Sequence, residues 1–229
     1  MPYLNAMLLL GACTEGSRGD ASTRSILPLG DSITEGVPFT YRYPLFNALS
    51  EDGYPFDLVG SHSEGAWEYP EDGWDTDHEG HSGWTTQRIQ EALPSWLPLY
   101  SVDIALIHLG TNDAGEDNVS ASYDAMSSIV SQLRAHNDAV AICIAQILPF
   151  GSQLKEDGES GVSELNRFVV DWNSSLETLA SEMATAASPI LLVDMYTSFG
   201  DADLDDGVHP NQSGAEKMAE QWLDCVSQF

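Results

Sequence analysis

Two groups of polar residues, far apart in the sequence, have the types needed for hydrolysis by a serine nucleophile. Ser32 stands in PLGDSITEG, directly after the apolar run SIL, and Asp206 and His209 stand in DDGVHPN. A Ser hydroxyl attacks a carbonyl group when a base takes its proton, and a neutral His oriented by a carboxylate is the usual base near pH 7. The residues therefore predict Ser32 as nucleophile, His209 as base and Asp206 as the orienting acid.

Each of these assignments has an ordinary alternative. A Ser at the end of a strand most often caps a helix by accepting a bond from a backbone N–H. Asp205 is a competing carboxylate beside His209, although its extra residue of separation makes Asp206 the first choice.

Attack on an ester also needs hydrogen-bond donors for the oxyanion that forms. Three candidates follow predicted strands or loops: the backbone N–H of Ser32, the backbone N–H of Gly83 and the side-chain amide of Asn112.

Apolar runs and helix-period segments alternate along the chain, which predicts a parallel, doubly wound sheet. We expect strands within 25–29, 56–60, 102–109, 140–147 and 190–194, and helices within 43–52, 85–93, 120–136, 162–187 and 212–227. Ligands of such sheets bind outside the carboxyl ends of the strands. Ser32, Asn112 and the Asp206–His209 pair all follow strand ends, so we expect them at one edge of the sheet.

Four motifs in fixed order carry a resemblance to a known superfamily. GDSIT, HSGWT, GTND and DGVHP resemble the motifs of the SGNH (GDSL-type) hydrolases, and PLGDSITEG, FDLVGS and DHEGHSGWT are similar to carbohydrate esterase family three, whose members remove acetyl groups from xylan. The resemblance implies a three-layer α/β/α sandwich with a five-stranded, flavodoxin-like parallel sheet. It implies the triad Ser32, His209 and Asp206, and an oxyanion hole of Ser32, Gly83 and Asn112. Thr111 departs from the pattern, because many relatives have Gly at that position.

The implied activity is hydrolysis of O-acetyl esters on polysaccharide through an acetyl-enzyme, without a cofactor. Two alternatives remain open: a broad-specificity arylesterase or lysophospholipase with the same triad, and an inactive relative that only binds carbohydrate.

Substrate contacts are expected from residues near the motifs. Aromatic side chains in the long loop 61–83 and beside it are a natural platform for sugar faces, or else a small satellite core. Tyr41 and Arg42 follow the nucleophile segment and are expected to line the pocket. The candidate contacts are Asp31, Tyr41, Arg42, Trp67, Trp74 and Trp84.

The remaining polar residues are predicted to be structural. His62, His78 and His81 match no common metal-site spacing, so hydrogen bonding within the loop is favoured and no metal is expected. His108 lies in an apolar strand, which favours a core histidine with satisfied hydrogen bonds. Asp31 and Asp113, beside the motif residues, are interpreted as hydrogen-bonding scaffolding.

Composition and the first residues bear on location and partners. The chain has 8 Lys and Arg against 36 Asp and Glu, a net charge of −28, which repels nucleic acid and anionic membranes. Such a surface suits either a salt-loving organism or an ordinary acidic secreted protein.

The apolar segment MLLLGAC and the polar residues after it predict an export signal and leader over residues 1–23, with Cys13 as a lipid attachment site. We expect one domain over residues 24–229, secreted, monomeric and without a membrane span. For Cys143 and Cys225, two buried free thiols are favoured over a bridge.

Overall fold

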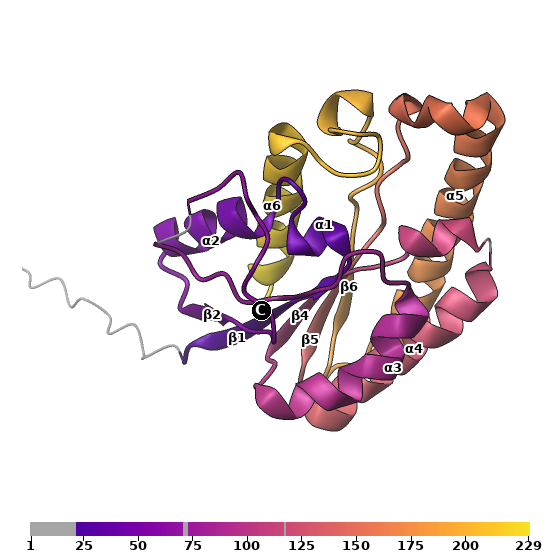
Figure 1. The fold of residues 1–229 in the computed structure, drawn as a ribbon. Helices are drawn as coiled ribbons and strands as arrows, with labels where there is room; N and C mark the ends of the chain where they lie inside the picture. Colours follow the sequence, from indigo (N-terminus) through magenta and orange to yellow (C-terminus); the bar gives the residue numbers. More distant parts are fainter. Residues whose placement is uncertain (1–21, 71–72, 117) are drawn as a thin grey trace, which may run out of the picture.

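The computed structural model describes residues 22–70, 73–116 and 118–229, and it is built around a parallel sheet (Figure 1). The main strands are β1 (Arg24–Gly30), β2 (Phe56–Leu58), β4 (Ile104–His108), β5 (Ala141–Ala145) and β6 (Ile190–Val193), in the order β2-β1-β4-β5-β6. This is the flavodoxin-type order, in which the chain reverses direction across the sheet between β1 and β4. The predicted fold class is confirmed.

A sixth strand was not predicted. β3 (Glu79–Gly80) has two residues and pairs with the end of β1, where Leu29 lies opposite Glu79 and Gly30 opposite Gly80. It has no apolar run, so the pattern that predicts the other strands is absent. Its position beside Gly30 places the segment after it next to the end of β1.

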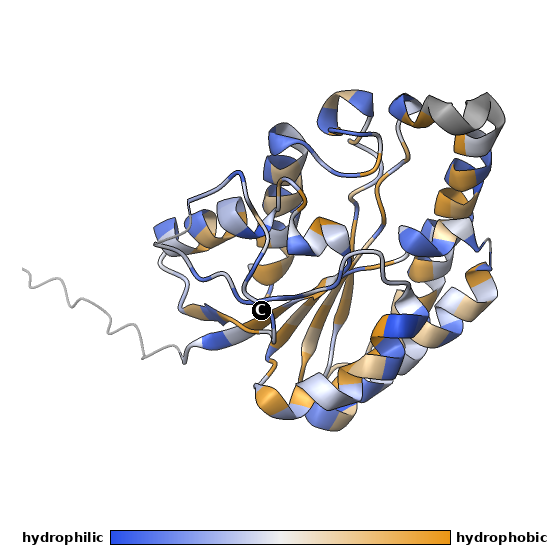
Figure 2. Ribbon diagram, in the orientation of Figure 1, coloured by the Kyte–Doolittle hydropathy of each residue, from blue (hydrophilic) through white to orange (hydrophobic). Residues whose placement is uncertain are grey.

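The central strands are covered by helices on both faces. Every residue of β4 (IALIH) and β5 (AICIA) is buried, which explains why their sequences do not alternate between apolar and polar residues. Figure 2 shows hydrophobic residues along the strands of the sheet.

Two groups of helices form the outer layers (Figure 1). One core contains side chains of α3 (Thr86–Trp96), α4 (Val119–His136) and α5 (Gly158–Met183), and the other contains side chains of α1 (Ser32–Glu35), α2 (Arg42–Glu51) and α6 (Gln212–Val226). The sequence predicted all of these except α1, which is too short for a helical period. The segments between strands and helices contain short 3₁₀ turns, at Leu97–Leu99, Asn112–Gly115, Ser152–Asp157 and Asp201–Asp203.

Within the described residues, no helix combines the length and the apolar character that a membrane span requires. The predicted lipid site at Cys13 and nearly all of the predicted leader lie outside the described residues.

The expectation of two free thiols is wrong. Cys143 of β5 and Cys225 of α6 form a disulfide, with their Cα atoms 6.3 Å apart. Both residues line the same core, and they meet because α6 packs over β5. This juxtaposition comes from tertiary packing between residues 82 positions apart, which the sequence alone does not reveal.

Removing this bond should lower stability. A cross-link across a separation of 82 residues restricts the unfolded chain, so the double variant Cys143→Ala/Cys225→Ala should lose about 2–4 kcal/mol of unfolding free energy. Urea unfolding followed by fluorescence measures the change. Reduced wild-type protein should unfold at a similarly lowered urea concentration, whereas equal midpoints for oxidised and reduced protein would contradict the prediction.

Candidate active site

Ser32 is placed by the turn that joins β1 to α1. β1 ends at Gly30, and Ser32 is the first residue of α1. Asp31 caps this helix, because its carboxylate accepts the N–H of Ile33 at 3.0 Å. The capping interaction therefore belongs to Asp31, and the Ser32 hydroxyl contacts His209 instead.

Two hydrogen bonds join the predicted triad residues. The Nε2 atom of His209 lies 2.9 Å from Ser32 Oγ, and its Nδ1 atom lies 2.8 Å from Asp206 Oδ2. With Nδ1–H donating to the carboxylate, Nε2 is the acceptor for the Ser32 hydroxyl proton. This is the arrangement required for a base-activated serine.

Hydrogen bonds within the loop from Asp206 to His209 fix its conformation. The second carboxylate oxygen of Asp206 accepts the backbone N–H groups of Val208 and His209, at 2.9 and 2.8 Å. Gly207 has a φ of +91°, a conformation that favours glycine. Asp205 is exposed, and its backbone N–H donates to the carbonyl of His209, so Asp206 is the carboxylate that reaches the ring.

The environment keeps Asp206 ionised. Partial burial alone would raise the pKa of its carboxyl group, but the hydrogen bonds from the His209 backbone, the His209 ring and the Val208 backbone lower the pKa below its ordinary value. An ionised carboxylate at this position can stabilise a protonated imidazole.

Donors suited to an oxyanion lie on three segments. Within the described part of the chain, no protein group accepts a bond from the backbone N–H of Ser32 or of Gly83. The side-chain amide of Asn112 donates to the carbonyl of Trp84 at 3.0 Å and lies 3.4 Å from Asp31 Oδ2. Gly83 and Asn112 line the same hollow of about 500 Å³.

The acidic residues next to Ser32 and Asn112, Asp31 and Asp113, form hydrogen-bonding scaffolding, as predicted. Asp31 is fully buried, and this burial raises its pKa to about 7 despite the hydrogen bond from Ile33. Asp113 accepts the backbone N–H and the hydroxyl of Thr86, and its other oxygen accepts the hydroxyl of Ser122 at 2.7 Å. Asp113 thereby connects the start of α3 with α4.

Three expected substrate contacts are corrected, because Asp31, Tyr41 and Arg42 have no exposed surface. The Arg42 guanidinium donates to the carbonyl groups of Thr34, Glu35 and Thr76, which fixes the segment after Ser32 against the loop 61–83. The Tyr41 hydroxyl is 3.1 Å from the Thr34 hydroxyl. These side chains support the nucleophile segment from inside.

The three tryptophans differ in exposure. Trp67 is 69% exposed and lines a hollow of about 340 Å³ together with Trp74. Trp74 also packs against Tyr43, with the Arg42 guanidinium over its ring, so it is partly structural. Trp84 packs against the core that contains side chains of α3, α4 and α5, and the Arg88 guanidinium lies over its ring.

The histidines outside the triad have different surroundings. His108 is a core residue, but neither ring nitrogen has a partner among the described residues, so the expected hydrogen bonds are not present. Burial lowers the pKa of His108 to about 4. His78 is hydrogen-bonded within the loop, through Nδ1 to the N–H of Gly80 and Nε2 to the carbonyl of Glu64.

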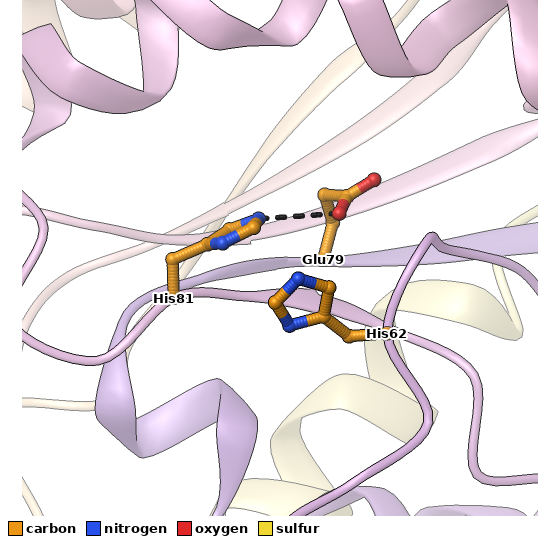
Figure 3. A group of neighbouring side chains, drawn as sticks. All are labelled: His62, Glu79 and His81. Atoms are coloured by element: carbon orange, nitrogen blue, oxygen red, sulfur yellow. Dashed lines mark hydrogen bonds and ion pairs between the residues drawn. The ribbon is translucent and has the colours of Figure 1, made fainter.

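One functional candidate was missed by sequence reasoning. The buried carboxylate of Glu79 lies beside both His62 and His81 (Figure 3). The pattern Glu-x-His at residues 79–81 is the signal, because alternate residues of an extended segment face the same side. The spacing of the histidines alone does not indicate this cluster.

Comparisons with known proteins show which family the chain belongs to. The GDSL-like Lipase/Acylhydrolase family matches residues 29–217, and the chain belongs to this family. It is 28% identical to a multidomain esterase of Ruminococcus flavefaciens, over 91% of this chain and 29% of that protein. It is 22% identical to an acetylxylan esterase of Xylanibacter ruminicola, over 84% of this chain and 41% of that protein.

Among solved structures, a carbohydrate esterase family 3 protein from Talaromyces cellulolyticus is similar throughout. It is 27% identical, with a TM-score of 0.79, and the match covers 90% of this chain and 97% of that one. The chain thus spans less than half the length of the two curated relatives but nearly all of this single structure.

Asn112→Ala should test the third oxyanion donor. If the amide stabilises the transition state and not the bound ester, kcat should fall about 10²–10³-fold with little change in KM. Steady-state hydrolysis of p-nitrophenyl acetate gives both constants, and the thermal unfolding midpoint controls for loss of the Trp84 contact. An unchanged kcat would remove Asn112 from the mechanism.

Proposed function

We propose that this protein is a serine esterase that releases acetate from O-acetylated polysaccharide of the xylan type. The observation that carries the proposal is the continuous chain of contacts from Asp206 through His209 to Ser32, at 2.8 and 2.9 Å. Gly83 and Asn112, which line one hollow, are two further candidate oxyanion donors.

The proposed reaction assigns a role to each of these residues. Ser32 Oγ attacks the acetyl carbonyl carbon while His209 Nε2 takes its proton, and Asp206 stabilises the resulting imidazolium. The negative charge on the carbonyl oxygen is held by N–H donors of Ser32, Gly83 and Asn112. The tetrahedral intermediate collapses, and the sugar oxygen leaves with the proton from His209. Water then attacks the acetyl-enzyme by the same route and releases acetate.

The lining of the hollow supports a sugar ester. Apart from Gly83, every residue around it has a polar side chain, and a sugar presents hydroxyl groups that such side chains can bind. The lining residues are Gly83, Thr85, Gln87, Arg88, Glu91, Asn112 and Glu116. The names of the curated acetylxylan esterase and of the carbohydrate esterase structure support the same substrate class.

A second candidate, an esterase for longer acyl chains, is favoured by one observation. A hollow of about 260 Å³ is lined partly by apolar side chains, including Leu154, Val162 and Leu165. Leu154 lies beside Gly207 of the catalytic loop, so an acyl chain of moderate length has apolar surface within the same region.

A secreted location belongs to the same proposal. Disulfides form and persist in oxidising compartments, so the Cys143–Cys225 bond supports export, and the net charge of −28 argues against nucleic-acid partners. Monomeric state and lipid attachment at Cys13 remain predictions.

Acetate release from acetylated xylan tests the proposal. Wild-type protein should release acetate, a chemically deacetylated sample should yield none, and Ser32→Ala should leave at most a trace, because the nucleophile is lost. p-Nitrophenyl octanoate serves as the comparison substrate, and faster turnover of octanoate than acetate would favour the second candidate. Full activity of Ser32→Ala, or failure of wild-type protein to react with a fluorophosphonate, would refute the serine mechanism.

Trp67→Ala tests the aromatic platform. If the exposed ring binds sugar units next to the reacting acetyl group, the variant should raise KM on acetylated xylan several-fold and leave p-nitrophenyl acetate kinetics unchanged. Leu99→Ala is the matched control, because Leu99 is a similarly exposed apolar side chain at 68%. Equal KM values for wild type and Trp67→Ala on the polymer would assign Trp67 no part in binding.

A further inference from the structure

A cluster of metal-ligating side chains lies outside the triad. His62 follows β2, Glu79 is in β3, and His81 comes directly after β3 (Figure 3). One nitrogen from each ring and one oxygen of Glu79 lie within 4.8 Å of one another. We propose that these three residues form a binding site for a divalent transition-metal ion of the zinc type.

The ligand types and spacing suit this class of ion. Two imidazoles and one carboxylate, with one position left for water, are a common Zn²⁺ set. Bonds of this kind place neighbouring ligand atoms of a tetrahedral ion about 3.3 Å apart. His81 Nε2 lies 3.1 Å from Glu79 Oε1, so these two ligands already have the separation that one ion requires.

Two of the three ligands are fixed in place. The fully buried carboxylate of Glu79 accepts the hydroxyl of Ser61 at 2.5 Å and also the hydroxyl of Tyr100. The His81 ring stacks against both Trp84 and Trp96, with ring centroids 4.6 and 4.3 Å away. Outer contacts of this kind orient metal ligands and raise affinity.

His62 completes the set and gives access from solvent. Its side chain is 33% exposed, and its ring centroid is 4.4 Å from that of His81. A small movement of this ring brings its nitrogen within bonding distance of an ion held by the other two. His78 does not take part, because both of its nitrogens contact backbone groups.

The main alternative is a simple ion pair between His81 and Glu79. That pair does not require His62, whereas the metal site does, so His62 distinguishes the two explanations. The proposed metal site takes no part in the proposed hydrolysis, although His81 is close in sequence to Gly83. A bound ion would connect the segment after β2 to His81, two residues before Gly83.

Metal binding by the full chain is the test. After treatment with a chelator and dialysis, the protein is titrated with Zn²⁺ by calorimetry in excess Mg²⁺, which occupies weak sites on the acidic surface but competes poorly for imidazole. Titration with Co²⁺ gives a second reading, because its visible absorption reports imidazole coordination. We expect one equivalent of Zn²⁺, bound at least about tenfold more weakly by His62→Ala.

Three control variants test whether Zn²⁺ binding is specific to this cluster. Glu68→Gln removes an exposed acid from the same loop, His136→Ala removes an exposed histidine elsewhere, and His209→Ala removes the catalytic ring. All three should bind Zn²⁺ as wild type does. Absence of stoichiometric binding in excess Mg²⁺, equal affinity in wild type and His62→Ala, or loss of binding in His209→Ala would each overturn the proposal.

Discussion

The contact between Ser32 Oγ and His209 Nε2 is the interaction on which the rest of the site depends. It joins residues 177 positions apart, so it exists only because the parallel sheet brings the segments that follow different strands to one edge. A neutral hydrogen bond of this type contributes on the order of 1 kcal/mol and cannot determine the fold. The apolar cores on both faces of the sheet fix the strand ends, and the contact follows from that placement.

Buried polar groups hold the segment that contains Ser32 in place. The Arg42 guanidinium donates to the carbonyl of Thr34 in α1 and to that of Thr76 in the loop 61–83, and Asp31 caps the first turn of α1. An isolated buried charge is costly, so these groups persist because backbone partners satisfy them. Residues that look like pocket residues from their proximity to Ser32 in the sequence thus form the internal support of the site.

The fold was largely predictable because its signals are local. Runs such as IALIH and AICIA identify covered strands, and the long helices carry an apolar face. β3 and α1 are too short to show a hydrophobic period, so the sequence pattern does not predict them. The three residues of the proposed triad follow from their chemistry and motifs, and the structure brings them within hydrogen-bonding distance of one another. The burial of Arg42, the partners of Glu79 and the Cys143–Cys225 bond depend on segments distant in the sequence, and no local pattern encodes them.

The disulfide has a consequence for the position of His209, the proposed base. Cys225 lies in α6, whose first residues directly follow the loop of His209, and Cys143 lies in β5, in the same sheet as β1, which leads to Ser32. The disulfide therefore links α6, the helix that follows His209, covalently to the central sheet. Reduction of the disulfide would remove this covalent link. The position of α6 over the sheet would then depend on noncovalent packing alone.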